Sequence, residues 1–195
     1  MDAPTARAAT KMPDADRDLL ERHLRGDETA FEEIYDRYGE MVYNLALRLS
    51  GEPEEAADLT QEAFLKIHRH LNGFRGRSAL RTWIYRVAIN CCRSRYRRQR
   101  AWRSRLVLDD VDGMEALPDR RRSPEEHAIA QRTGELVEQA LEALPRIYRE
   151  AVYLRDLEGL TYEEIAQVLG LRLGTVRSRI ARGRDRLRLL LEEVQ

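Results

Sequence analysis

Residues 159–190 hold the feature that most constrains the fold: two short helical patterns on either side of a glycine-centred turn. Thr161 and Glu164 have the spacing of a capping box, in which a hydroxyl and a carboxylate satisfy open amides at a helix start. Gly170 can adopt the left-handed backbone conformation that is common at helix C-termini. A second helix is predicted to begin near Gly174 and Thr175. The pattern therefore predicts a helix-turn-helix.

The second helix of this motif has one apolar side and one arginine-rich side. Its apolar side, expected to be buried, consists of Val176, Ile180, Leu187 and Leu190. Its other side carries Arg177, Arg179, Arg182, Arg184 and Arg186, with Asp185 as the single acid among them. A solvated basic face on an ordinary helical bundle is one interpretation. Self-repulsion of the arginines favours an anionic partner instead, and the DNA major groove fits a helix of this kind.

The rest of the chain also has helical periodicity, and strand signals are nearly absent. Between residues 16 and 105, helices are predicted to break at residues 26–27, 51–53 and 72–73, with Asp27 as a favourable N-cap. Three apolar stripes are expected to pack together as a bundle. They consist of Phe31, Ile34, Tyr35, Tyr38, Val42, Leu45 and Leu49; of Leu59, Ala63, Phe64, Ile67 and Leu71; and of Leu80, Trp83, Ile84, Val87 and Ala88.

The predicted fold class is all-α, with two small helical domains joined by a flexible linker. Residues 1–15 resemble a loose tail, residues 16–105 the first domain, and residues 106–123 a linker that could extend to about 60 Å. Residues 124–195 form the second domain, which begins at the cap Ser123. Its apolar positions before the helix-turn-helix are Leu136, Val137, Ala140, Leu141, Leu144, Ile147, Ala151, Val152 and Leu154. No segment has the length or composition of a signal peptide or membrane span.

The net charge of zero conceals two segments of opposite sign. Residues 93–105 contain seven arginines and no acid, whereas residues 51–64 contain five acids and no base. This segregation predicts one polyanionic partner and one basic partner. A solvated helix face is the simpler interpretation of the acidic segment considered alone.

Residues 74–100 combine a glycine loop with a basic helix that contains aromatic residues. Arginines interleaved with aromatics suit melted nucleic acid, where bases stack on rings and phosphates meet guanidinium groups. Trp83 falls on the apolar stripe, so we expect it in the core. Phe74, beside Gly73 and Gly76, is the better candidate for a base contact.

Catalytic and metal-binding patterns are absent from the sequence. The four histidines are scattered, and His68 and His70 lack the spacing that places two ligands on one helix face. No phosphate loop or nucleophile elbow occurs. Cys91 and Cys92 are expected to be reduced thiols of a cytosolic protein, with a redox sensor as the alternative. We therefore predict no enzyme, no cofactor and no metal.

Three motifs resemble, in order and spacing, the extracytoplasmic-function group of bacterial sigma factors. They are DLTQEAF at residues 58–64, FRGRSALRTWIYRVAIN at residues 74–90, and GLTYEEIAQVLGLRLGTVRSRIARGR at residues 159–184. The resemblance implies a cytoplasmic RNA polymerase subunit that selects promoters. A stand-alone helix-turn-helix regulator is the alternative, and a helical adaptor or an enzyme is a more distant one. A dimeric regulator would need a palindromic operator and no polymerase-docking helix.

The resemblance also implies partners and site residues. The acidic helix would bind the clamp helices of the polymerase β′ subunit, and the chain would also bind the β flap. Residues implied in polymerase binding are Asp58, Gln61, Glu62 and Phe64. Residues implied in capturing an extruded base of the −10 element are Phe74, Arg75, Ser78, Asn90 and Ser94. Residues implied at the −35 element are Arg155, Thr175, Arg177, Ser178, Arg182 and Arg184. An anti-sigma factor is a further implied partner. Arg77 and Leu173 depart from the family pattern, in which an acid and a proline are frequent.

Overall fold

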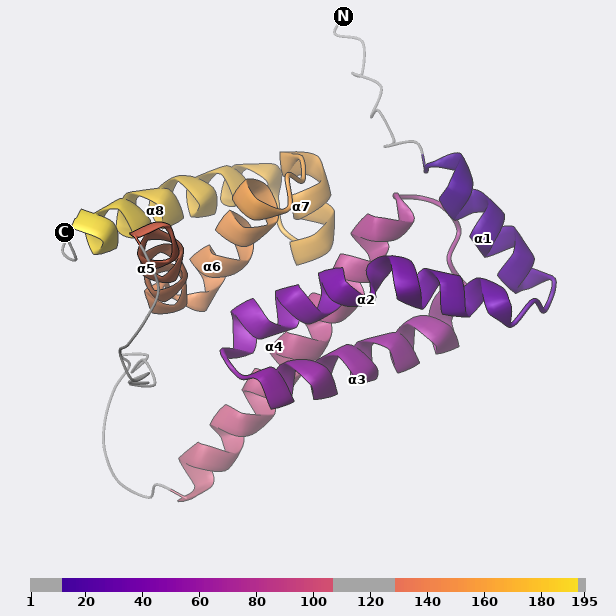
Figure 1. The fold of residues 1–195 in the computed structure, drawn as a ribbon, viewed down its shortest axis with the longest axis horizontal. Helices are drawn as coiled ribbons and strands as arrows, with labels where there is room; N and C mark the ends of the chain where they lie inside the picture. Colours follow the sequence, from indigo (N-terminus) through magenta and orange to yellow (C-terminus); the bar gives the residue numbers. More distant parts are fainter. Residues whose placement is uncertain (1–11, 107–128, 193–195) are drawn as a thin grey trace, which may run out of the picture. The chain divides into compact units, whose positions relative to one another are not determined.

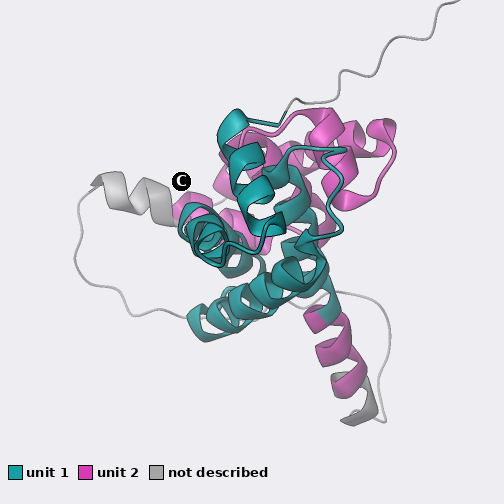
Figure 2. Ribbon diagram, turned by 90° about the vertical axis from the view of Figure 1, so that its right-hand side faces the viewer, with its two compact units in different colours: residues 1–94 teal, residues 95–195 magenta. Residues whose placement is uncertain are grey.

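The computed structural model describes residues 12–106 and 129–192, and every regular element in these ranges is helical (Figure 1). The all-α prediction is therefore confirmed. The elements are α1 (Asp14–Leu24), α2 (Thr29–Ser50), α3 (Pro53–Leu71), α4 (Leu80–Leu106), α5 (Ile129–Ala143), α6 (Arg146–Val152), the π-helix η1 (Tyr153–Leu157), α7 (Tyr162–Leu169) and α8 (Leu173–Glu192). Internal contacts divide the chain into two compact units, Met1–Ser94 and Arg95–Gln195 (Figure 2). Except for Leu106, the predicted linker lies outside the described residues, as does the cap Ser123.

The first unit consists of α1, α2, α3 and most of α4. Helix α2 packs along α3, and α1 packs on α2. Most members of the three predicted stripes are buried: Ile34, Tyr38, Val42, Leu45, Leu59, Ala63, Phe64, Ile67, Leu71, Leu80, Trp83, Ile84 and Ala88. The prediction for Tyr35 is wrong, because its side chain is 47% exposed. The Tyr35 ring packs edge-on against Phe64 at 4.7 Å, which covers one side of the ring and leaves the rest in water.

The helices of this unit are separated at the predicted breaks. Gly51 follows α2 with a φ of 74°, a left-handed conformation that glycine adopts without steric cost, and its amide donates to the Leu47 carbonyl. Pro53 then occupies the first turn of α3, where the missing amide would have no helical partner. The short connection places α2 and α3 side by side (Figure 1).

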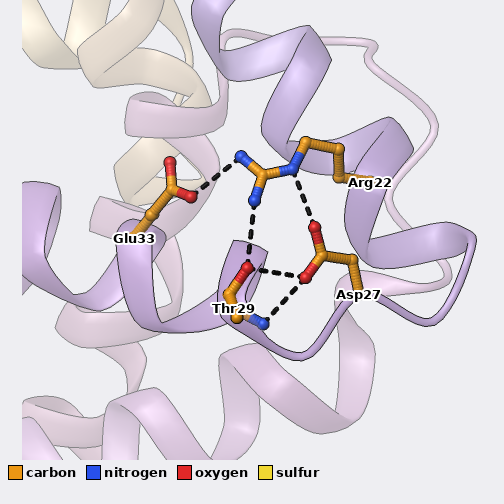
Figure 3. Close-up of polar contacts among 4 residues, drawn as sticks. All are labelled: Arg22, Asp27, Thr29 and Glu33. Carbon is orange, nitrogen blue, oxygen red and sulfur yellow. Dashed lines mark hydrogen bonds and ion pairs between the residues drawn. The ribbon is translucent and has the colours of Figure 1, made fainter.

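A polar cluster around Arg22 fixes the corner between α1 and α2 (Figure 3). Helix α2 begins at Thr29 with Glu28 at its N-cap position, one residue later than predicted, and the Asp27 carboxylate accepts bonds from the amide and hydroxyl of Thr29 at 3.0 and 2.6 Å. Arg22 donates to Asp27 and pairs with Glu33, both at 2.8 Å. The bonds from Thr29 and then Arg22 lower the pKa of Asp27 below its ordinary value. Asp27 therefore satisfies an amide at the start of α2 and also helps to orient the two helices.

A buried carboxylate attaches α1 to α2. Asp16 is 3% exposed and accepts hydrogen bonds from the Tyr38 hydroxyl at 2.7 Å and from Arg37 at 2.9 Å. Burial and the neighbouring Asp16 carboxylate raise the pKa of Tyr38. Asp14 and Ala15, which the sequence assigned to the tail, form the first turn of α1. Because a buried charge is stable only when it is paired, this cluster specifies where α1 packs.

The second unit is organised by the packing of α6 against α8. Gly183 lies at this contact, and a Cβ added there would be 2.5 Å from Val152 Cγ2 and 3.3 Å from Tyr148 Cβ. A core of Leu141, Leu144 and Val152 is covered by Val137, Leu187 and Leu190. Ile147, an apolar position after Pro145, is 47% exposed. Pro145 separates α5 from α6, so the apolar stripe does not continue in phase.

The first helix of the helix-turn-helix, α7 (Tyr162–Leu169), has the predicted ends. The Glu164 amide donates to the Thr161 hydroxyl at 3.2 Å, and the Glu164 carboxylate accepts the Thr161 amide at 2.8 Å, so the capping box is confirmed. Gly170 ends α7 with a φ of 67°. Helix α8 begins at Leu173, slightly earlier than predicted, because the Arg172 carbonyl already accepts the amides of Thr175 and Val176.

Candidate nucleic-acid and partner interfaces

The N-terminal half of α8 exposes three of the residues expected at DNA. Arg177, Ser178 and Arg182 are exposed, whereas Val176 and Ile180 on the other side are buried. Ser178 and Arg182 are four residues apart and therefore share one helix face. The expected backbone contact Thr175 is half-buried and accepts a hydrogen bond from the Ser178 hydroxyl at 3.0 Å through its carbonyl. This half of α8 can present guanidinium and hydroxyl groups to a groove.

The π-helical turn η1, directly before the helix-turn-helix, carries Arg155 and Asp156. A π turn has one more residue than an α turn and re-aims the side chains on it. Arg155 donates to the Leu160 carbonyl at 2.8 Å, and its guanidinium lies 4.9 Å from the Tyr162 ring centroid. The guanidinium of Arg177 lies 6.0 Å from the same ring. Tyr162 therefore brings together two residues that the sequence assigned separately to DNA binding.

Two arginines farther along α8 interact within the second unit. The Nε of Arg184 donates to one oxygen of Asp156 at 3.0 Å, and its Nη2 pairs with the other oxygen. This two-point pairing raises the pKa of Arg184. Arg186 lies 4.8 Å from the ring of Tyr148. The charge of Arg184, one of the predicted −35 residues, is therefore already partly balanced by Asp156.

The acidic helix α3 exposes Asp58 and Gln61, as a docking surface requires. Glu62 is partly exposed and pairs with Lys66 at 2.7 Å, an interaction that raises the pKa of Lys66. Phe64 is only 4% exposed, so it supports the surface from beneath. Leu65, directly after it, is 59% exposed and adds an apolar group to the acidic face.

The residues expected at a captured base lie in the 74–78 loop and along α4. Phe74 is half-buried with its ring 5.3 Å from that of Trp83, which is in the core as predicted. Arg75 is exposed and Ser78 is half-buried. Asn90 and Ser94, exposed and half-buried respectively, follow Trp83 on one face of α4 at helical spacing. The Phe74–Trp83 contact attaches the loop to the start of α4, the helix that carries Asn90 and Ser94.

Two sequence families and close relatives identify the chain. The family described as Sigma-70 region 2 matches residues 34–102, and the one described as Sigma-70, region 4 matches residues 134–187. The chain is 40% identical over 175 residues to RNA polymerase sigma-H factor of Pseudomonas aeruginosa, covering 87% of this chain and 90% of that protein. It is 38% identical over 179 residues to ECF RNA polymerase sigma-E factor of Escherichia coli K12, covering 87% and 91%. The chain belongs to the extracytoplasmic-function sigma factors of the sigma-70 family.

A solved structure supports the same assignment of this sigma factor. The sigma factor RpoE from Bartonella quintana, solved in complex with the anti-sigma factor NepR, has a TM-score of 0.64 and 25% identity. The similarity covers 83% of this chain and 96% of that one. The acidic face of α3 and residues 74–94 fall within the region 2 match, and η1 and the helix-turn-helix fall within the region 4 match.

The described part of the sigma factor offers neither a membrane-spanning helix nor a cluster of metal ligands. Among the described residues, no helix is both long and apolar enough to span a bilayer, and no three His, Cys, Asp or Glu side chains are grouped as metal ligands. Cys91 and Cys92 are buried and form no disulfide. The ammonium of Lys66 lies 3.4 Å from the Cys91 sulfur, which connects α3 to α4.

Sequence reasoning missed two residues of these interfaces. Tyr162 follows the cap Thr161, and nothing in the local pattern indicates that arginines 7 residues earlier and 15 residues later contact its ring. Leu65 does carry a signal, because it lies outside the apolar stripe of its own helix. Its spacing from Asp58, Gln61 and Glu62 places it on the same helix face, so the sequence could have indicated an apolar residue within the proposed docking face.

Proposed function

We propose that this sigma factor directs core RNA polymerase to promoters that have separate −35 and −10 elements, and opens the DNA at the −10 element. It would act in the cytoplasm without catalytic chemistry of its own. The observation that supports this most is the presence in one chain of an acidic helix face, a glycine-containing loop before a basic helix, and an arginine-bearing helix-turn-helix. Residues 16–105 would serve the polymerase and the −10 element, residues 124–195 the −35 element, and residues 106–123 would connect them.

Docking on polymerase would use the exposed face of α3. Asp58, Gln61 and Glu62 offer acceptors and negative charge to the clamp helices of the β′ subunit, while Leu65 offers apolar area. Interfaces of this type combine an apolar centre with a polar rim, and complementary charge accelerates association. Phe64 would maintain the shape of the face from below. The second domain would bind the β flap.

Opening at the −10 element would follow from selective capture of an unstacked base. Phe74, Arg75 and Ser78 would form the pocket, with Asn90 and Ser94 beside it on α4. A base can reach such a pocket only after it leaves the duplex stack, so binding favours the melted state. The packing of Phe74 on Trp83 at 5.3 Å supports this assignment, because it fixes a ring against which a base can stack.

Reading of the −35 element would use α8. Arg177, Ser178 and Arg182 would contact base edges, and Arg155 and Thr175 the backbone. Arg184, which is paired with Asp156, would act at this site mainly by holding η1 against α8.

Replacing Arg177 by alanine is expected to cost about 1–3 kcal/mol of binding free energy at one upstream base pair and to relax the base preference there. An equal loss on every sequence, measured by competition binding, would make Arg177 a phosphate contact instead.

An anti-sigma factor is the further partner we propose. The similar sigma factor from Bartonella quintana was solved with an anti-sigma protein, and 96% of that chain is matched here. A protein that covers the docking face of α3 would prevent binding to polymerase.

Run-off transcription with purified bacterial core polymerase tests the proposed function. With this chain added, transcripts should start at defined positions on a pool of genomic promoters, whereas core polymerase alone should give none. A second, well-behaved sigma factor controls for the activity of the core enzyme. If the control supports transcription and this chain does not, the proposal is wrong. Tight binding to a palindromic duplex without polymerase would favour the stand-alone regulator.

A further inference from the structure

One aromatic ring is shared by two arginines that come from different elements of the second unit. Tyr162 is the first residue of α7 and is half-buried. Its ring centroid lies 4.9 Å from the guanidinium of Arg155 in η1 and 6.0 Å from that of Arg177 in α8. Both distances are within the range in which the electron-rich face of a ring attracts a cation.

These contacts reduce two unfavourable contributions to DNA binding by exposed arginines: repulsion between their charges and loss of side-chain freedom. Like charges repel, and an aromatic ring contributes partial negative charge that offsets this repulsion. A long arginine side chain also loses conformational freedom when it binds, and a contact already present in the free protein reduces that loss. Arg155 has a second restraint, since it donates to the Leu160 carbonyl at 2.8 Å.

The N-terminus of α7, next to these arginines, already has a carboxylate bound to it, which reduces its attraction for an external anion. Two amides at this helix end, those of Thr161 and Glu164, are satisfied by the capping box, in which the Glu164 carboxylate accepts from both the amide and the hydroxyl of Thr161, at 2.8 and 3.0 Å. A negative charge already occupies this helix end. Attraction of phosphate at this junction therefore comes mainly from the two guanidinium groups.

We propose that Tyr162 is a positioning residue for promoter recognition: its ring holds Arg155 and Arg177 together in the conformations in which they contact −35 DNA. The proposal rests on the −35 function proposed above. Arg155 would contact the DNA backbone and Arg177 a base edge. By positioning both, the ring would affect both where the protein sits along the duplex and which base it recognises. Loss of the ring should therefore weaken both affinity and discrimination.

Two substitutions separate the ring from its hydroxyl. In the full chain assembled with core polymerase, Tyr162→Phe keeps the ring and Tyr162→Leu removes it. The probe is a duplex promoter that the wild-type holoenzyme selects from a randomised library, together with the same promoter altered at the −35 element. We expect Tyr162→Leu to weaken −35-dependent binding by about 5- to 30-fold, from the loss of two exposed cation–ring contacts, and Tyr162→Phe to stay within about twofold.

A matched control removes a similar contact that involves no proposed DNA residue. The ring of Tyr148 lies 4.8 Å from Arg186, so Tyr148→Leu should leave −35 discrimination unchanged. Thermal unfolding of each variant reports on general loss of structure. A loss of binding in Tyr162→Leu that is matched by Tyr148→Leu at equal loss of stability would overturn the positioning role.

A mutant cycle gives the decisive result. In a chain that already carries Arg155→Ala and Arg177→Ala, adding Tyr162→Leu should change binding by no more than about twofold, because the ring has nothing left to position. The same penalty in both backgrounds, equal losses for Tyr162→Phe and Tyr162→Leu, or wild-type binding by Tyr162→Leu would each overturn the proposal. If the wild-type holoenzyme itself ignores the −35 element, it is the proposed function that fails.

Discussion

Replacing Gly183 by alanine should destabilise the second unit, although alanine is the better helix former. The alanine Cβ would lie 2.5 Å from Val152 Cγ2, well inside contact distance. Val152 is a β-branched residue in a helix and has essentially one allowed rotamer, so it cannot swing away. The backbone of α6 or α8 must then shift, and overpacking of this kind costs about 1–3 kcal/mol. Replacing glycine by alanine in a helix gains about 1 kcal/mol of helix propensity, which is less than most of this overpacking cost. We therefore expect the free energy of unfolding to fall by about 1 kcal/mol.

Thermal unfolding of the full chain, followed by circular dichroism, measures this effect. A loss of about 1 kcal/mol should lower the midpoint of the second unit by about 4–8 °C. Gly174→Ala is the matched control, because it lies in the same helix and its Cβ would meet nothing within 4 Å. It should leave stability unchanged or raise it slightly. If Gly183→Ala is as stable as Gly174→Ala, the close packing of α6 on α8 is refuted.

Three further outcomes are expected. Reversing the charge of Asp58 and Glu62 together should abolish co-purification with core polymerase while the circular dichroism spectrum is retained, and persistent binding would refute the docking face. Phe74→Ala should impair open-complex formation on duplex promoter more than on pre-melted template, and equal impairment would remove Phe74 from the pocket. Burial, followed by the proximity of His68, lowers the pKa of His23, so the folded state binds its proton less readily than the unfolded state. Stability should therefore fall as the pH drops from 7 through about 6.5, and His23→Gln should flatten this dependence in thermal unfolding; an unchanged slope would contradict it.

Features set by neighbouring residues could be predicted from the sequence. The capping box of Thr161 and Glu164 and the left-handed Gly170 are determined within a few residues, and both are confirmed. The burial of Trp83 also followed from its place on an apolar stripe. Periodicity failed at Tyr35, because a phenol can pack on one side and remain hydrated on the other.

Contacts between distant segments could not be predicted in this way. Asp156 and Arg184 are 28 residues apart, and their pairing depends on how η1 and α8 pack. The same packing brings Arg155 and Arg177 to one ring. The Asp156–Arg184 pair and the contact of Arg155 with the Tyr162 ring both involve residues of the π turn at 153–157, which has no recognisable sequence signal here. Helix ends and buried stripes were therefore more predictable than contacts between segments that are far apart in the sequence.

Sequencing of transcript starts from a randomised promoter library tests the central claim most directly. With core polymerase and this chain, the selected promoters should share two unlike upstream elements at a fixed spacing. Arg177→Ala should relax the upstream element and Phe74→Ala the downstream one. A single palindromic element, or starts with no shared upstream sequence, would contradict a chain that reads one element with α8 and melts the other beside α4.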